Sequence, residues 1–180
     1  MIKSTLKHFF IIIIVALLQV AILPNLSSKM GNLDLVLVVL IFIAVVYKFY
    51  LGVIYGLILG FFLDLYSALP FGMIILCYML VLYFVYLIFQ KLLTNKSFYS
   101  LLGVTFIGTI IYSILIYISK ISYYFINTKD YLLIKNYSII SFQNIGWQVS
   151  LNISLAIILF MCFHFGSRQF NAGFIDTTKK

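Results

Sequence analysis

Long apolar stretches separated by short polar interruptions run through almost the whole chain. An α-helix needs about 20 apolar residues to cross the hydrocarbon core of a bilayer, and several of these stretches approach that length. The pattern predicts an all-α integral membrane protein, a bundle of about six transmembrane helices that forms a single membrane domain over residues 1–180. The predicted spans cover residues 7–23, 33–47, 49–66, 71–89, 98–119 and 145–165.

Three interruptions shape this predicted bundle. Pro24 is expected to end the first span, because a proline lacks the N–H that a helix needs. The second and third spans are separated only around Lys48, which predicts a tight helical hairpin. The longest connection, residues 120–143, is rich in Tyr, Ile and Asn. We expect an outer loop there that lies at the membrane interface, in preference to a cap that binds a partner.

Composition places most of the chain inside lipid. Hydrophobic residues make up 64% of the sequence and charged residues 9%, whereas a soluble domain carries about 25% charged residues. The net charge is +8, but the basic residues lie at the ends of apolar stretches and form no single patch. That distribution is typical of charges that set membrane topology, so no nucleic-acid partner is expected.

The basic residues also orient the bundle. With six spans and the N- and C-termini cytoplasmic, more Lys and Arg residues fall on the cytoplasmic side than outside, as the positive-inside rule requires. The cytoplasmic set is Lys3, Lys7, Lys48, Lys91, Lys96, Arg168, Lys179 and Lys180, and the outer set is Lys29, Lys120, Lys129 and Lys135.

The third predicted span carries a stripe of glycines that ends in a carboxylate. Gly52, Gly56, Gly60 and Asp64 are spaced four residues apart, so they share one face of a helix. The glycines form a groove that another backbone can approach closely, either a span of this chain or a partner's helix. A carboxylate at the centre of a membrane helix costs about 2.5–3.5 kcal/mol, so Asp64 needs an interaction that offsets the cost.

Asp34 and Asp64 lie at similar distances from the Lys48 interruption, on the two sides of the predicted hairpin. Antiparallel helices would bring both carboxylates to one level near the outer face. Two carboxylates at one depth repel each other unless one is protonated or a cation lies between them. Lys29 and Lys120 are predicted on the same side and are candidates for that cation.

The two carboxylates differ in their expected local roles. Asp34 precedes its span, and we expect it to cap that helix. Asp64 lies at the C-terminal end of its helix, where the helix dipole disfavours negative charge. Ser67, Pro70 and Gly72 follow, so Asp64 is expected either to hold the turn into the fourth span or to bind a partner.

Other polar residues inside the predicted spans are expected to form hydrogen bonds between helices, with the lining of a substrate cavity as the alternative. Those residues are Gln19, Gln148 and Asn152. The fifth span carries a stripe of small residues that is a candidate to face the glycines, namely Thr105, Thr109 and Ser113.

The sequence contains little material for catalysis. It has two His, no Glu and a single Arg, and it shows no nucleophile–base pair, metal-ligand spacing, phosphate-binding loop or dinucleotide fingerprint. Cys77 and Cys162 lie inside apolar stretches without CxxC spacing, so a disulfide or metal site is not expected. We predict a protein that is not an enzyme and that needs no cofactor.

The segment GLILGFFLDLYSALPFG, residues 56–72, resembles the hallmark of the MreD family of rod shape-determining membrane proteins. GNLDLVLVVL, residues 31–40, resembles the start of that family's second span, with Asp34 shifted and the family's proline absent. The resemblance covers most of the chain loosely and the region 52–72 well. The matching motif positions are Gly56, Gly60, Asp64, Ser67, Pro70 and Gly72.

The resemblance implies a non-enzymatic subunit of the bacterial cell-elongation machinery, which directs peptidoglycan synthesis from the cytoplasmic (inner) membrane. Its implied partners are the bitopic protein MreC, through it the cytoskeletal protein MreB, and the glycosyltransferase RodA with its transpeptidase. The outer ends of the second and third spans would then form a docking site for a partner's membrane helix, with membrane lipid around the bundle.

One alternative function belongs to another class. The chain is also compatible with the substrate-binding membrane subunit of an energy-coupling vitamin transporter. Such a subunit needs an outward cavity with convergent polar and aromatic groups, for which Asp34, Asp64, Gln148 and Asn152 are candidates. It also needs a face of small residues for the coupling subunit, which the glycine stripe would supply.

Overall fold

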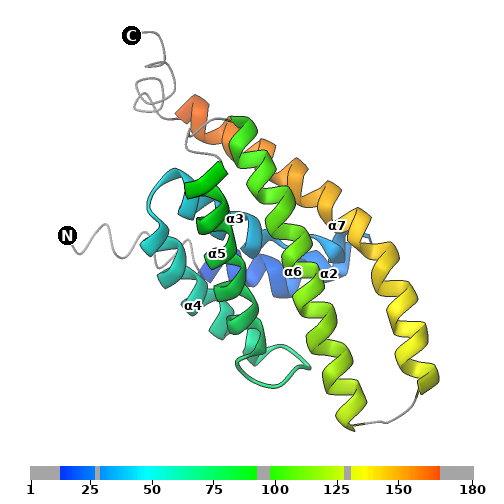
Figure 1. Ribbon diagram of the computed structural model, residues 1–180. Helices are drawn as coiled ribbons and strands as arrows, with labels where there is room; N and C mark the ends of the chain where they lie inside the picture. Colours follow the sequence, from blue (N-terminus) through cyan, green and yellow to red (C-terminus); the bar gives the residue numbers. More distant parts are fainter. Residues whose placement is uncertain (1–12, 27–28, 93–97, 128–130, 167–180) are drawn as a thin grey trace.

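The computed structural model describes residues 13–26, 29–92, 98–127 and 131–166, and these ranges are helical with no β-strand. The predicted all-α fold is therefore confirmed for this part of the chain. The elements are a π-helical turn η1 (Leu18–Ile22), α2 (Leu23–Leu26), a 3₁₀ turn η2 (Met30–Asn32), α3 (Leu35–Val46), α4 (Phe49–Leu65), α5 (Met73–Leu92), α6 (Phe98–Asn127) and α7 (Tyr131–Gly166) (Figure 1).

Three of these helices are long and apolar enough to cross a membrane, over Met73–Gln90, Phe98–Tyr123 and Asn144–Phe163. Three shorter apolar helical segments accompany them, Ile13–Ile22, Met30–Val46 and Phe49–Leu65. Residues 7–12 of the predicted first span lie outside the described residues, as do the basic residues near both ends of the chain.

The helical segment over residues 13–26, which we call the first helix, does not end at Pro24, so this prediction is wrong. It continues as α2 to Leu26. The reason is the π-helical turn that precedes the proline, in which the N–H of Leu23 donates to the carbonyl of Leu18, five residues back. A proline removes one hydrogen bond from a helix, and local π geometry is a known way to accommodate that loss. The helix therefore passes through Pro24.

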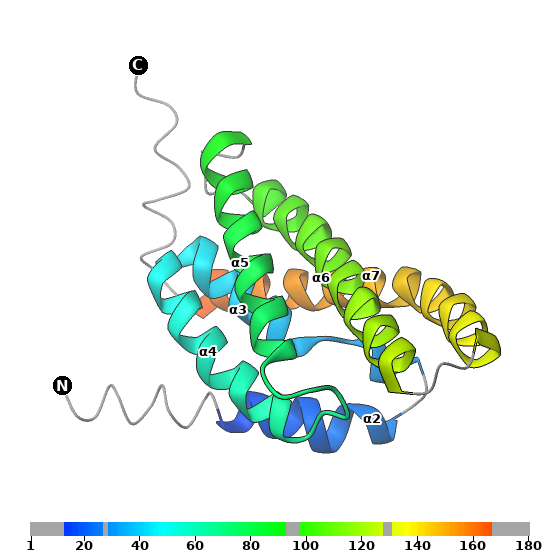
Figure 2. The same cartoon turned by 60° about the horizontal axis from the view of Figure 1, so that its bottom comes forward.

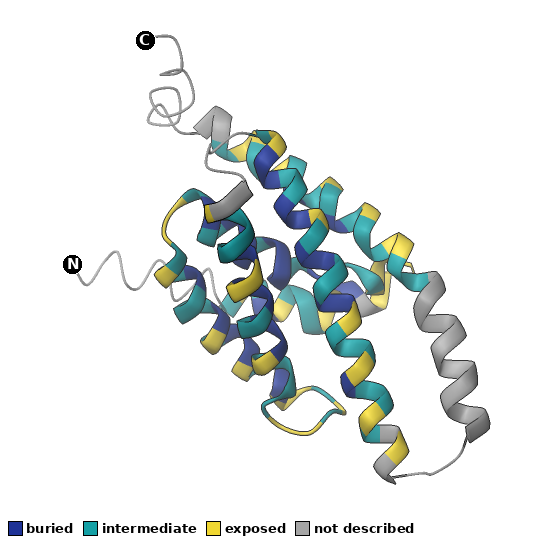
Figure 3. Cartoon of the chain, in the orientation of Figure 1, coloured by how far each residue is buried: buried dark blue, intermediate teal, exposed yellow. Residues whose placement is uncertain are grey.

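Helix α3 is the centre of the bundle. It contacts α4, α5, α6 and α7, and none of its residues is exposed, so Figure 3 draws it in the colours of buried and intermediate residues. Its sequence is apolar on every side, which is the pattern of a helix without a solvent-facing stripe. Its buried residues are Val36, Leu37, Val38, Leu40, Ile41, Phe42 and Val45.

The chain reverses direction after α3, where sequence predicted a hairpin. Lys48 adopts an extended backbone conformation, and α4 begins at the next residue. α4 then packs against α3 on one side and α5 on the other. Figure 2 shows the first helix lying beside the C-terminal half of α4.

The glycine stripe of α4 packs inside this chain. A Cβ added at Gly52 would lie 2.9 Å from the Cβ of Ala44 on α3. At Gly56 it would lie 2.7 Å from the Met79 side chain on α5. At Gly60 it would lie 3.1 Å from the backbone of Ile75, also on α5. Of the two alternatives for the groove, the structure uses it for close approach of α3 and α5.

The polar stripe of α6 does not face these glycines, so that expectation is wrong. Thr105, Thr109 and Ser113 instead donate to the carbonyl four residues earlier in α6, each at 2.8 Å. The bulkier α5 supplies the surface that meets α4. The glycines leave room for its side chains, so a second face of small residues is not required.

The predicted outer loop over 120–143 is also corrected. α6 runs to Asn127 and α7 starts at Tyr131, so both sides of the segment are helical. At 1.5 Å per residue, the 30 residues of α6 and 36 of α7 extend over about 45 and 54 Å, more than the roughly 30 Å hydrocarbon core. The sequence prediction ended each span where the apolar residues end. A helix can continue beyond that point, because its backbone hydrogen bonds are made within the helix itself.

We expect Gly52→Ala to destabilise the protein and Gly146→Ala to be neutral or mildly stabilising. The new methyl at position 52 meets the Cα of Ala44 at 3.2 Å, and a backbone atom cannot turn away. Overpacking of this kind costs about 1–3 kcal/mol. Nothing lies within 4 Å of a Cβ at Gly146, where alanine only improves helix propensity. Thermal unfolding of both variants in detergent measures the difference; equal melting temperatures would contradict the packing.

Candidate functional site: a buried polar cluster

A buried carboxylate begins the central helix. Asp34 is 5% exposed and immediately precedes α3. Its Oδ1 accepts a hydrogen bond of 2.9 Å from the N–H of Leu37, three residues on. This is the geometry of an N-cap residue, which satisfies one of the N–H groups left unpaired at a helix start. The predicted capping role of Asp34 is thus confirmed.

Two tyrosines complete the surroundings of this carboxylate. The hydroxyl of Tyr78, on α5, donates to Oδ1 at 3.1 Å and lies 3.3 Å from Oδ2. Tyr112, on α6, lies against Tyr78. The two rings stack with centroids 5.1 Å apart and planes 5° from parallel. Asp34 therefore joins the start of α3 to α5, and the stacked rings extend this contact to α6.

The side-chain amides of Asn152 and Gln19 form hydrogen bonds with the backbone just before and at the start of α3. The N–H of Asp34 donates to Oδ1 of Asn152 on α7 at 3.0 Å, and Nδ2 of Asn152 lies 3.2 Å from the hydroxyl of Thr109. Gln19 accepts from the N–H of Leu35 at 2.8 Å and donates to the carbonyl of Leu33 at 3.1 Å. Non-helical backbone at membrane depth is tolerated where protein groups satisfy it in this way.

A further hydrogen bond joins α6 to α7, since the hydroxyl of Ser113 shares its one proton between the carbonyl of Thr109 and Oε1 of Gln148, each at 2.8 Å. With the bonds of Asn152 and Gln19, this confirms that all three amide side chains bond to groups on other elements, as predicted. We call Gln19, Asp34, Tyr78, Thr109, Tyr112, Ser113, Gln148 and Asn152 the polar cluster.

Asp64 caps a different helix. It is 4% exposed, at the end of α4, and its two oxygens accept hydrogen bonds from the N–H groups of Ile74 and Ile75 at 3.0 and 3.1 Å. Both donors lie in the first turn of α5. The positive end of α5 thus compensates the unfavourable dipole of α4. Of the two expected roles for Asp64, the contacts support the holding of the turn.

The turn between α4 and α5 uses the rest of the family-like motif. Ser67 Oγ accepts from the N–H of Leu69 at 3.0 Å. The carbonyl of Pro70 accepts from the N–H of Met73 at 3.2 Å. Gly72 has φ +94°, a conformation that side-chain-bearing residues rarely adopt, so this position favours glycine. Each motif residue after Asp64 therefore has a local structural task.

The two carboxylates are used separately in this arrangement. Asp34 binds the start of α3 and Asp64 the start of α5. Lys29, one candidate cation, lies over the ring of Trp147, with Nζ 4.6 Å from the centroid. Within the described ranges, no group of three His, Cys, Asp or Glu residues is placed to hold a metal ion. Both carboxylates therefore fix helix starts. Their oxygens already accept hydrogen bonds from backbone N–H groups and, at Asp34, from the hydroxyl of Tyr78.

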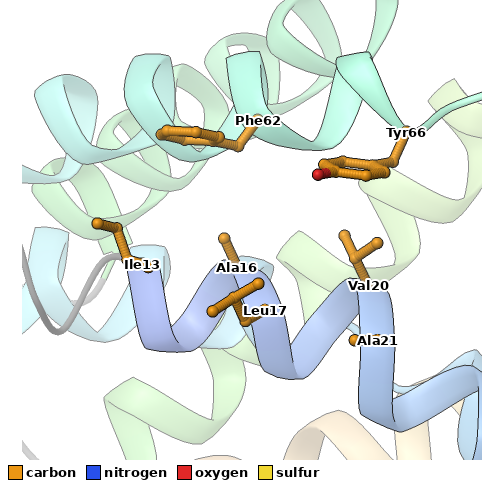
Figure 4. A pocket seen from close by; sticks show the side chains of 7 residues that line it. All are labelled: Ile13, Ala16, Leu17, Val20, Ala21, Phe62 and Tyr66. Carbon is orange, nitrogen blue, oxygen red and sulfur yellow. The ribbon is translucent and has the colours of Figure 1, made fainter.

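An apolar groove lies beside the Asp64 turn. It has a volume of about 200 Å³ between the first helix and α4. Figure 4 shows Phe62 and Tyr66 projecting from α4 across the gap, with Ala16 and Val20 facing them. The residues that line this groove are Ile13, Ala16, Leu17, Val20, Ala21, Phe62 and Tyr66.

Sequence reasoning did not single out Tyr78 and Tyr112. They are two of 14 tyrosines, most of which look like interfacial residues in a membrane protein. The available signal was a phenol placed well inside an apolar stretch, because a buried tyrosine hydroxyl usually has a hydrogen-bond partner.

Comparison with known proteins identifies one family. The family model described as rod shape-determining protein MreD matches residues 3–166, nearly the whole chain. No curated protein and no solved structure matches the chain. The matched range contains the glycine stripe, the α4–α5 turn and every member of the polar cluster.

We expect Asn152→Leu to lower stability by about 1–3 kcal/mol, because it leaves the buried N–H of Asp34 without its acceptor. Ser154→Ala is the matched control, since Ser154 lies on the same helix, is exposed, and among the described residues bonds only to its own helix backbone, at 2.9 Å. Thermal unfolding in detergent compares the two variants. Equal stability of Asn152→Leu and the wild type would show that the cap at Asp34 does not depend on α7.

Proposed function

Because the chain belongs to the family of the rod shape-determining protein MreD, we propose that it is a non-enzymatic scaffold of the bacterial cell-elongation machinery. The family implies a membrane protein with a role in rod-shape determination. The observation that carries the proposal is the family match over residues 3–166. Our proposal adds a multi-pass topology in the cytoplasmic membrane, with six spans and both termini cytoplasmic.

The use of the polar residues supports a scaffold in preference to a catalyst. In the described ranges, Asp34 and Asp64 are buried and bonded to backbone N–H groups of helix starts. A general acid or base needs access to a substrate proton, whereas these carboxylates are enclosed by the fold. Their role in the proposal is to hold a rigid surface.

In this proposal, the scaffold docks the membrane helix of a bitopic partner, which we identify with MreC, and through it acts with MreB and with RodA and its transpeptidase. The apolar groove beside Asp64 is the candidate docking position. Two aromatic side chains form one wall and small residues form part of the other, which suits an inserted apolar side chain. The glycines and Asp64 contribute indirectly, because they position α4 and its turn.

The first test concerns cell shape. Depletion of the protein in its rod-shaped cell should make the cells round, because elongation loses its scaffold. Microscopy of cell width and length measures the effect. Unchanged shape together with a new vitamin requirement would contradict the proposal and favour the alternative of a vitamin-transporter subunit.

The second test concerns the groove. Tyr66→Ala should reduce co-purification of the bitopic partner from membranes by several-fold, because it removes one of the two aromatic side chains that form one wall of the groove. Tyr50→Ala is the control: Tyr50 is on the same helix and similarly exposed, at 69% against 71%, but lies away from the groove. Partner recovery is measured relative to the amount of inserted protein. Full recovery with Phe62→Ala/Tyr66→Ala would exclude the groove as the docking position.

A further inference from the structure

A second hollow, of about 120 Å³, lies between α6, α7 and the 3₁₀ turn η2. It differs from the apolar groove because polar side chains form much of its wall. Asn32, Tyr117, Lys120, Asn144 and Gln148 contribute to it. We call it the polar pocket. The partner docking proposed above does not use it.

Each free polar group of this pocket can donate a hydrogen bond. Oε1 of Gln148 is engaged by the hydroxyl of Ser113, so the Nε2 amide of Gln148 is a donor without an acceptor among the described residues. In the same part of the chain, the hydroxyl of Tyr117 and the side-chain amides of Asn32 and Asn144 have no hydrogen-bond partner. Donors that converge on one hollow suit a ligand with several acceptor oxygens.

The charge of the pocket favours an anion. Lys120 lines it, and none of the described residues that line it is acidic. Nearby Asp34 does not counter this charge from the pocket wall, because its carboxylate is buried and bonded to Leu37 and Tyr78. An ammonium group with neutral donors around it is a suitable environment for a phosphate.

The depth of the pocket favours a lipid as the source of that phosphate. Lys120 lies near the end of the apolar segment Phe98–Tyr123, and Asn144 begins the apolar segment Asn144–Phe163. Both ends therefore lie where hydrocarbon gives way to headgroups. Trp147, with Lys29 over its ring, lies at the same end, and such aromatic and basic residues are typical of the interface. We propose that the polar pocket binds the phosphate of an anionic phospholipid headgroup.

The test measures lipid binding to the purified full-length protein in neutral detergent micelles. Native mass spectrometry follows the titration with phosphatidylglycerol or phosphatidylcholine, and a separate arm uses inorganic phosphate. We expect phosphatidylglycerol to bind more tightly than phosphatidylcholine. Lys120→Gln should weaken this binding about tenfold, and Lys120→Arg should retain it. Lys29→Gln, at the same end of the bundle but outside the pocket, should have no such effect.

Tyr117→Phe is a second variant in case Lys120→Gln does not fold, because it removes only the hydroxyl group of a half-buried residue. It should weaken phosphatidylglycerol binding about threefold. Equal binding of the two lipids by the wild type would overturn the proposal. So would equal losses in Lys120→Gln and Lys29→Gln, or binding of inorganic phosphate without a preference for phosphatidylglycerol. None of these measurements involves a protein partner, so they are independent of the docking proposal.

Discussion

The N-cap of α3 by Asp34 is the interaction on which the rest of the bundle depends. α3 is a 12-residue helix at the centre of the protein. The N–H groups of its first turn therefore lie inside the fold, where water cannot bond to them. Each such group costs several kcal/mol in hydrocarbon if it stays unpaired. Asp34, Gln19 and Asn152 supply acceptors for them, and Tyr78 in turn supplies a donor for the carboxylate. One helix start thus ties together η1, α5 and α7.

The second carboxylate, Asp64, also accepts hydrogen bonds from the start of a helix, but from a helix other than its own. Asp64 sits at the unfavourable end of α4 but accepts from the first turn of α5. The glycines before it bring α4 within reach of α5, and Gly72 closes the turn between the two helices. A stripe that looks like a partner-binding motif in sequence therefore serves the fold, and the side chains of Phe62 and Tyr66 point away from these contacts into the apolar groove.

Sequence predicted the features that depend on local chemistry. Apolar runs located the helices, the Lys48 interruption located the hairpin, and the position of Asp34 before an apolar run predicted its capping role. Features that depend on packing between helices could not be predicted from the sequence. The partners of Gly56 and Gly60 required knowledge of which helix lies opposite, and the continuation through Pro24 required the π-helical turn. The helical ends of α6 and α7 extend past the apolar limits because helix length is not set by lipid.

The distance in sequence between the members of the polar cluster has a consequence for biosynthesis. Asp34 and its acceptor Asn152 are 118 residues apart. At a translation rate of about 5–20 residues per second, roughly 6 s or more pass between the synthesis of one and of the other. During that interval the N-terminal helices are already made, but the start of α3 lacks the amide that α7 provides. The order of synthesis therefore makes the arrival of the last helix the step that completes the centre of the bundle.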